Sequence, residues 1–131
     1  MATWDAIVIG GGHAGCEAAR VLALRGLSTL LVTDSLEGLA RLSCNPSVGG
    51  VGKGHLVREI DALGGLMAKV ADRTGIQFRL LNASKGPAVQ GLRCQSDRQR
   101  YPEAVREVLF AVPGLTLREG RVCDILVENG R

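Results

Sequence analysis

A short apolar run followed by a glycine-rich turn constrains the fold more than any other part of this chain. Residues Ala6–Ile9 form a run that is too short for a helix and is bounded by glycine, so they predict a buried strand. Gly10, Gly12 and Gly15 follow with the spacing G-x-G-x-x-G, and the Ala-rich sequence after them predicts a helix from about Ala14 to Arg25. A glycine pattern placed directly between a strand and a helix predicts a dinucleotide-binding turn.

The three glycines would have separate tasks in such a turn. Gly10 permits the tight bend, Gly12 lets a diphosphate approach the backbone, and Gly15 lets the helix pack closely on the strand. The diphosphate would lie against the free N–H groups and the positive dipole end of the helix. The alternative is a glycine turn that only closes a βα unit and binds nothing.

A second strand completes a β-α-β unit. Gly26 is suited to end the first helix in a left-handed conformation, and the apolar residues Ser28–Val32 predict a strand. Because two parallel strands joined by a helix form a right-handed crossover, the chain predicts an α/β, Rossmann-like fold with a parallel sheet. Asp34, just after this strand, is a candidate for binding ribose hydroxyls or, alternatively, for capping a turn.

The composition fits a single globular domain and excludes several other classes of protein. The chain has 131 residues, and 22% of them are charged, as in an ordinary soluble domain. Aromatic residues make up only 3%, which argues against a stacking platform for single-stranded nucleic acid. No apolar run has the length of a membrane span, and no charged segment of a signal peptide is present. We therefore expect no membrane contact.

Cysteine usage indicates a reducing compartment. The four cysteines show neither C-x-x-C pairs nor zinc spacing, so we expect free thiols, a cytoplasmic protein and no metal site. Cys16 on the first helix and Cys123 on a C-terminal strand are expected in the core. Cys94 is expected to be an unreactive thiol in a loop.

Positive charge is concentrated in the middle of the chain. Residues 41–100 carry ten basic and four acidic side chains, whereas residues 1–40 and 101–131 have net charges of −2 and −1. A polyanionic ligand is one interpretation, and a solvated basic face is the other. The basic candidates in this segment are Lys53, Lys85, Arg93, Arg98 and Arg100.

Residues Ser43–Leu56 contain a second glycine-rich stretch. It invites comparison with the phosphate loop G-x-x-x-x-G-K-[ST], but Ser47 replaces the first glycine and Gly54 replaces the hydroxyl residue that holds Mg²⁺. An ATPase or GTPase site is therefore rejected, while close backbone approach to an extended cofactor stays possible. Asn45, which precedes a proline, favours a turn that presents Cys44.

The rest of the pattern predicts further helices and strands. Apolar residues at helical spacing from Leu56 to Val70 predict a buried stripe, which Gly64-Gly65 interrupts. The later expected elements are a strand with one buried face at Ile76–Leu81, a loop at Asn82–Gly91, a helix at about Asp97–Val112, and strands at Leu115–Arg118 and Val122–Glu128. Asn129-Gly130 is a strong hairpin signal with no partner strand after it. We therefore expect residues 1–131 to be the first part of a longer domain.

Six segments of the chain carry a resemblance to one known family. They are Gly10–Ala19, Ser43–Pro46, Gly49–Leu56, Glu59–Met67, Gly75–Arg79 and Leu81–Val89. Together they resemble the MnmG/GidA family, the flavin subunit of the enzyme that installs carboxymethylaminomethyl (or aminomethyl) groups on C5 of the wobble uridine of tRNA. The resemblance covers nearly the whole chain, although residues 34–42 depart from the family pattern.

The resemblance implies a cofactor, a domain assignment and several partners. Residues 1–131 would be the N-terminal part of an FAD-binding domain, without the nicotinamide insertion and the C-terminal helical domain. The residues assigned to FAD are Gly10, Gly11, Gly12, His13, Ala14, Gly15 and Val122, the last contacting the adenine end through its strand. The full-length enzyme would use NADH as reductant and a folate-derived one-carbon donor, form a homodimer and act with an MnmE-type GTPase. The 131-residue chain alone would be inactive.

Cys44 is the candidate catalytic residue. C5 of uracil becomes a nucleophile only after a group adds to C6, and a thiolate is suited to this reversible addition. Cys44 lies in a glycine-rich turn with Lys53 and His55 downstream, and the resemblance implies a functionally important cysteine in this motif. The alternative is a small thiol that packs against the cofactor.

The remaining candidates concern tRNA and the glycine turn. The residues proposed to contact tRNA are Asn45, Lys53, Lys85, Arg93 and Arg98. His13 is expected to position the backbone and not to act as an acid or base, because no partner for proton transfer is evident. Two other function classes stay open: a flavin disulfide reductase, which lacks the second cysteine near Cys44, and a stand-alone, non-catalytic flavin-binding module.

Overall fold

The computed structural model describes residues 3–43 and 45–127. Cys44 and the Asn129-Gly130 pair therefore lie outside the described residues, and the expectations placed on them are not addressed by the fold. The described elements are β1 (Ala6–Ile9), α1 (His13–Leu24), β2 (Thr29–Thr33), β3 (Ser47–Gly49), α2 (Lys53–Ala62), α3 (Met67–Thr74), β4 (Gly75–Leu81), η1 (Pro87–Val89), β5 (Gly91–Ser96), α4 (Arg100–Phe110) and β6 (Leu115–Glu119).

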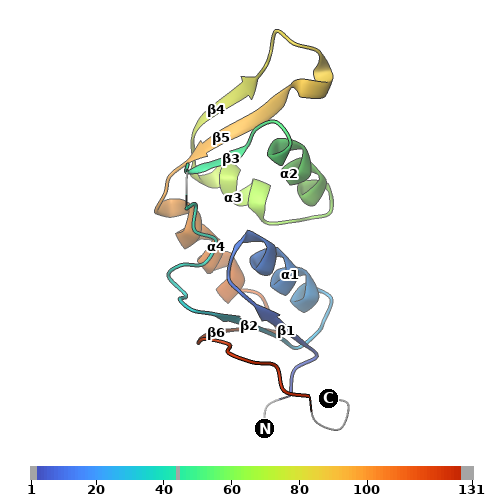
Figure 1. Cartoon of the computed structure of the whole chain (residues 1–131), viewed down its shortest axis with the longest axis vertical. Coiled ribbons are helices and arrows are strands. Elements are labelled where there is room, and N and C mark those ends of the chain that lie inside the picture. Colours follow the sequence, from blue (N-terminus) through green and yellow to red (C-terminus); the bar gives the residue numbers. More distant parts are fainter. Residues whose placement is uncertain (1–2, 44, 128–131) are drawn as a thin grey trace.

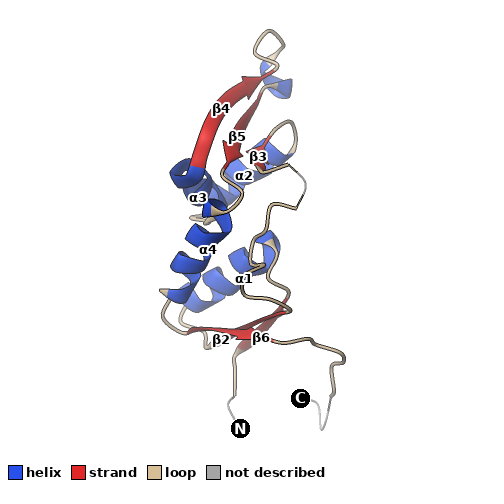
Figure 2. Ribbon diagram, turned by 90° about the vertical axis from the view of Figure 1, so that its left-hand side faces the viewer, coloured by secondary structure: helices blue, strands red, loops and turns tan. Residues whose placement is uncertain are grey.

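The first lobe is a parallel sheet with the strand order β1-β2-β6. Helices α1 and α4 both lie on one side of this sheet, as Figure 2 shows. Leu31 of the central strand is fully buried beneath them. The predicted α/β fold with a parallel sheet is confirmed, and β6 adds the third strand beside β2.

The second lobe is an antiparallel sheet with the order β3-β5-β4, together with helices α2 and α3. It is inserted between β2 and α4, and its β4–β5 hairpin extends beyond the helices at the top of Figure 1. One hydrophobic core runs through both lobes, because Leu31 and Cys16 belong to the same buried cluster as Val48, Val57 and Cys94.

Polar contacts from α1 also join the two lobes. Oε1 of Glu17, on α1, accepts hydrogen bonds from the backbone N–H groups of Leu66 (2.8 Å) and Met67 (2.7 Å). These groups open α3, where a helix has unsatisfied donors and a favourable dipole for negative charge. Nη1 of Arg20, one turn further along α1, donates to the carbonyl oxygen of Gly64 at 2.9 Å. Helix α1 therefore fixes the start of α3 from two points.

Several predicted helix boundaries are confirmed. Gly26 follows the C-cap of α1 with φ of +86°. The break at Gly64-Gly65 separates α2 from α3, and Gly64 also has a positive φ of +84°. The only proline of α4, Pro102, lies in the first turn, where it displaces no intrahelical hydrogen bond.

The predicted buried stripe on α2 is wrong in part. Leu63 is 88% exposed and Leu56 is also exposed, whereas Val57 faces the core together with Met67 and Val70 of α3. Because α2 ends before Gly64 and α3 begins in a new direction, one helical period cannot run through both helices. Within α2 itself the buried position is Val57 and not its neighbour Leu56, so the core-facing side of this helix also lies one residue away from the predicted stripe.

Strands β1 and β4 are less buried than predicted for a common reason: no more than one face of each strand is covered by other elements. β1 was expected to be buried, but Ile7 is 58% exposed on the face of the sheet that α1 and α4 leave open. The face of β4 that includes Phe78, also 58% exposed, was expected to be buried too. Because β4 is the edge strand of its sheet, Phe78 borders an open cavity that Val57 of α2 and Ala71 of α3 also line, and the helices do not close over it.

The sequence reading missed β5 and predicted a strand that is not found. Cys94 lies on β5 and is buried, so its assignment to a loop is wrong. Residues 122–127 form no strand, and Cys123 is exposed, so neither the strand at Val122–Glu128 nor the burial of Cys123 is confirmed. No helix among the described residues is long and apolar enough to span a membrane.

Candidate functional site

The glycine turn after β1 has the close packing that its spacing predicts. Gly10 has φ of +102°, a conformation that favours glycine, and its N–H donates to the carbonyl oxygen of Val32 at 2.8 Å. A Cβ atom at Gly15 would collide with the carbonyl oxygen of Gly10. Helix α1 can therefore start directly against the end of β1 only because position 15 has no side chain.

The start of α1 is open to an anion. Gly12 is the N-cap residue in an extended conformation, no side chain caps the helix among the described residues, and the first turn contains no acidic residue. A Cβ atom at Gly12 would meet nothing within 4 Å. The exposed N–H groups and the helix dipole thus face open space, which is the arrangement that binds phosphate groups.

The other residues of the turn differ in role. Gly11 is buried, and a Cβ atom there would lie 2.5 Å from Cδ2 of Leu39 and 2.7 Å from Oγ1 of Thr33. Gly11 is therefore a packing position beneath the turn. Ala14, by contrast, lies exposed in the first turn of α1.

His13 is the first residue of α1 and is half buried, with its ring centroid 5.7 Å from that of Tyr101. Burial lowers the pKa of His13, and the positive charge of Lys53 lowers it further. Its Nε2 atom is buried and has no hydrogen-bond partner among the described residues. A neutral imidazole with an unused nitrogen agrees with a positioning role and does not favour acid–base work.

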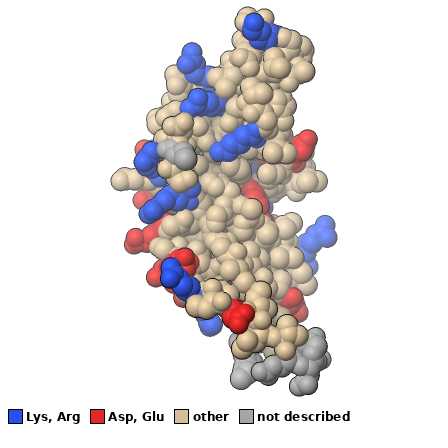
Figure 3. All heavy atoms as spheres, in the orientation of Figure 1, with Lys and Arg blue, Asp and Glu red and all other residues tan. Residues whose placement is uncertain are grey.

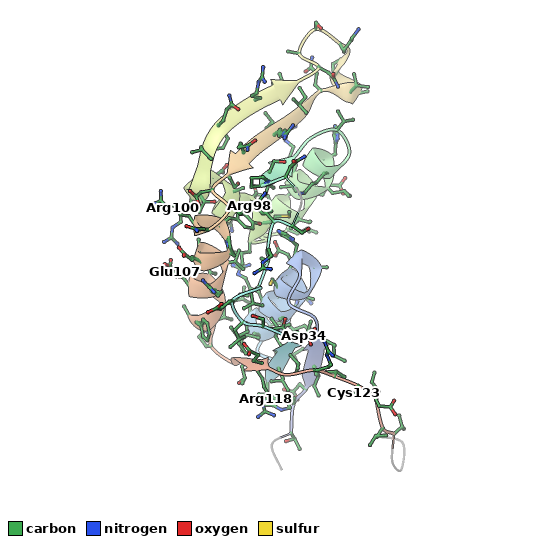
Figure 4. The ribbon with its side chains drawn as sticks, turned by 60° about the vertical axis from the view of Figure 1, so that its left-hand side comes forward. Asp34, Arg98, Arg100, Glu107, Arg118 and Cys123 are labelled. Atoms are coloured by element: carbon green, nitrogen blue, oxygen red, sulfur yellow. The ribbon has the colours of Figure 1, made fainter. Side chains whose placement is uncertain are left out.

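The carboxyl ends of the parallel strands bring two more predicted residues to this edge of the sheet. Asp34 follows β2 directly, and Gly120 after β6 donates its N–H to the carbonyl oxygen of Thr33 at 2.9 Å. An oxygen of the Asp34 carboxylate, which is labelled in Figure 4, lies 3.7 Å from Nε of Arg121, and both side chains are largely exposed. This exposed ion pair contributes little stability, so Asp34 is accessible to a ligand.

Val122 lies just beyond β6 and is 39% exposed. It belongs to no strand, so the strand predicted at this position is wrong. Its position after the third parallel strand still places it in the segment that leaves the carboxyl edge of the sheet, where ligands of such folds bind.

The candidates for tRNA contact spread over the second lobe and do not form one cluster. Lys53 begins α2 and its Nζ donates to the carbonyl oxygen of Ser47 at 3.0 Å. Lys85 lies in the β4–β5 loop, Arg93 on β5, and Arg98 before α4. Figure 3 shows Lys and Arg side chains on the upper part of the molecule, where this lobe lies.

A cavity of about 700 Å³ lies between the segment before Cys44 and the start of α4. Arg98, one of the predicted tRNA contacts, lines this cavity together with Ser43, which begins the motif that contains Cys44. Arg41 and Arg106 also line the cavity, and the sequence did not predict them as site residues. Arg41 and Arg106 lie far apart in the sequence, so no local pattern could indicate that they line the same cavity. Asn45, on the other side of Cys44, is exposed.

The two buried cysteines of the described chain, Cys16 and Cys94, lack the features of a nucleophile. Cys16 is buried as predicted, and its Sγ donates to the carbonyl oxygen of Gly11 at 3.4 Å. Burial raises the pKa of Cys16 to about 11 and also raises that of Cys94, so both thiols stay protonated near neutral pH. No group of three His, Cys, Asp or Glu side chains within residues 3–43 and 45–127 is arranged to hold a metal ion.

Comparison with known proteins gives one consistent set of relatives. Residues 5–131 match the family model described as glucose inhibited division protein A. The chain is 56% identical over 128 residues to the tRNA uridine 5-carboxymethylaminomethyl modification enzyme MnmG of Caldicellulosiruptor saccharolyticus, a match that covers 98% of this chain and 20% of that protein.

Solved structures agree with this result. The form I crystal structure of Aquifex aeolicus GidA matches with a TM-score of 0.93 and 47% identity over 98% of this chain and 21% of the other. PqsL of Pseudomonas aeruginosa, in complex with 2-aminobenzoylacetate, matches with a TM-score of 0.66 and 20% identity over 96% of this chain and 36% of the other, which shows the fold alone. The chain thus spans about a fifth of the length of the GidA and MnmG relatives.

Proposed function

This chain belongs to the glucose inhibited division protein A (GidA) family, and on that premise we propose that it is the N-terminal part of the FAD-binding domain of a tRNA-modifying enzyme. The enzyme would add a carboxymethylaminomethyl or aminomethyl group to C5 of the wobble uridine. The observation that carries the proposal is the start of α1 at Gly12, which is open and has no side-chain cap. The close contact of Gly15 with Gly10 holds this helix start against β1, and the chain is 56% identical to an MnmG enzyme.

The residues at the carboxyl edge of the parallel sheet fit the parts of FAD. The N–H groups of the turn from Gly10 to Gly15 would hold the diphosphate, and Asp34 would accept hydrogen bonds from ribose hydroxyls. Val122 would contact the adenine, and the neutral His13 would shape the turn. FAD, when bound, supplies the redox chemistry of the reaction.

Cys44 is our proposed nucleophile toward the uracil ring. Its Sγ would bond to C6, and the electron pair of the C5–C6 double bond would move toward O4, which makes C5 nucleophilic. After C5 has bonded to the one-carbon unit, loss of the C5 proton would restore the double bond and expel the thiolate. Among the described residues, the buried thiols of Cys16 and Cys94 are held protonated by burial, which supports the choice of Cys44.

The remaining components belong to the whole protein. We propose NADH as the reductant, a folate-derived one-carbon donor, an MnmE-type GTPase partner and a homodimer. Because this chain spans about a fifth of its relatives, turnover is assigned to the full-length enzyme and not to residues 1–131 alone. For tRNA we propose contacts at Asn45, Lys53, Lys85, Arg93 and Arg98, all in the second lobe or its borders.

Gly12→Ala in the full-length protein tests the cofactor site. A methyl group at position 12 would meet no protein atom within 4 Å, so the melting temperature of the cofactor-free protein should change little. The same methyl group would keep the diphosphate away from the helix N–H groups. Loss of one charge-assisted hydrogen bond, worth about 1.5–3 kcal/mol, predicts an FAD Kd raised roughly 10- to 100-fold. Titration of the apoprotein with FAD, followed by flavin fluorescence, measures this change.

Gly86→Ala is the matched control. Gly86 also has open space where a Cβ atom would lie and a negative φ of −63°, but it belongs to the β4–β5 loop. This variant should bind FAD with the wild-type Kd. An unchanged FAD Kd in Gly12→Ala would contradict the proposed diphosphate site.

A further inference from the structure

The β4–β5 hairpin carries a polar face that the proposed function does not use as a unit. One concavity of about 220 Å³ is lined by Gln77, Arg79 and Leu81 of β4 and by Arg93 and Gln95 of β5. The strand register places Gln77 opposite Gln95 and Arg79 opposite Arg93. We call the set Gln77, Arg79, Arg93 and Gln95 the arginine face.

Two arginines directly opposite each other on a sheet are unfavourable without a counter-charge. Like charges in a cross-strand pair destabilise the sheet, yet no Asp or Glu is among the residues that line this concavity. Within the described chain, neither Arg79 nor Arg93 forms an ion pair. Arg73 on α3 shows the usual solution, because its Nη2 lies 2.7 Å from Oε2 of Glu107. The arginine face therefore has unbalanced positive charge on a fixed scaffold.

The backbone beneath the arginine face is held closely. Gly49 of β3 has a φ of +109° and pairs with Arg93. A Cβ atom at position 49 would collide with the carbonyl oxygen of Leu92. Ser47 of the same strand pairs with Gln95, and its carbonyl oxygen accepts a hydrogen bond from Nζ of Lys53. A third positive charge is thus fixed at the edge of the same sheet.

We infer that the arginine face binds phosphate groups of the tRNA backbone. Each guanidinium offers paired N–H donors to two phosphate oxygens, and the glutamine amides add neutral donors that position the backbone. The inference rests on the proposed function for its ligand, since the charges alone require only a phosphate or a similar oxyanion. Anionic small molecules, such as NADH or a folate, are the competing source.

The surroundings favour a polymer over a small anion. The concavity has a volume of about 220 Å³, which is below the roughly 300–1,000 Å³ of pockets that bury most of a small-molecule ligand. It belongs to the β4–β5 hairpin, which projects beyond the helices in Figure 1. Positive charge also continues beyond it, with Lys85 in the hairpin loop and Lys53 at the sheet edge. A chain of phosphates can meet these charges in succession, and one small anion cannot.

The test uses full-length protein with both arginines replaced, Arg79→Gln and Arg93→Gln, and measures the Kd for unmodified tRNA over a range of KCl concentrations. Loss of two phosphate contacts should lower the slope of log K against log salt by about 1 for each arginine. We expect the Kd at low salt to rise at least tenfold. Arg25→Gln, an exposed arginine at the end of α1 in the first lobe, is the matched control and should leave both values unchanged.

Each outcome of this test supports or overturns the inference. Melting temperature and bound flavin are measured on every variant, and wild-type values beside a reduced salt slope support the arginine face. An unchanged slope overturns it, and so does a tRNA Kd that stays normal while FAD retention or NADH-driven flavin reduction falls. Wild-type protein that binds tRNA but no flavin would overturn the proposed function, whereas equal slopes in wild type and R79Q/R93Q overturn only the arginine face.

Discussion

Gly15→Ala in the full-length protein is expected to abolish FAD binding and to lower stability. The added Cβ atom would collide with the carbonyl oxygen of Gly10, which is backbone and cannot rotate away as a side chain can. Helix α1 would have to move off β1, and this displacement would also disturb the hydrogen bond of Cys16 to Gly11 and the N–H groups that face the ligand. Overpacking of this kind costs about 1–3 kcal/mol.

The measurements are the flavin absorbance of the purified protein and its thermal unfolding by circular dichroism. We expect less than a tenth of the wild-type flavin content and a lower melting temperature. Gly38→Ala is the control, because a Cβ atom at Gly38 would meet the carbonyl oxygen of Ser35 at an ordinary 3.5 Å. A Gly15→Ala protein that retains stoichiometric flavin would refute the tight-turn account of this site.

Cys44→Ser in the full-length protein is expected to stop formation of the modified wobble uridine while flavin stays bound. A serine hydroxyl is far less ionised than a thiol near neutral pH, so it cannot add to C6 of uracil at a useful rate. If the covalent step is lost, the rate should fall at least a hundredfold, which corresponds to about 2.7 kcal/mol of barrier. Mass spectrometry of nucleosides from tRNA incubated with the enzyme measures this product.

Two comparisons separate a nucleophile from a packing residue. Cys123→Ser changes an exposed thiol and should leave modification at the wild-type level. A packing role for Cys44 would alter flavin binding or melting temperature without a specific loss of rate. Wild-type modification by Cys44→Ser would therefore exclude the nucleophile and leave the flavin site untouched.

The sequence by itself determined the features that depend on local backbone constraints. Strand, tight turn and helix in the order β1, Gly10–Gly15 and α1 follow from glycine spacing, since only glycine tolerates both the positive φ at Gly10 and the contact at Gly15. Gly26 and the Gly64-Gly65 break were predictable for the same reason. The parallel sheet followed from two apolar strands joined by one helix.

Only the tertiary structure decided which surfaces are buried and which distant residues meet. The apolar alternation of β4 predicted a buried face, yet Phe78 is exposed, because burial depends on a covering element and not on the strand itself. β5 escaped notice because its polar residues gave no apolar run. Its pairing with β4 nevertheless sets Arg93 opposite Arg79. Cross-strand register is a long-range property, so no local sequence signal could place these two charges side by side.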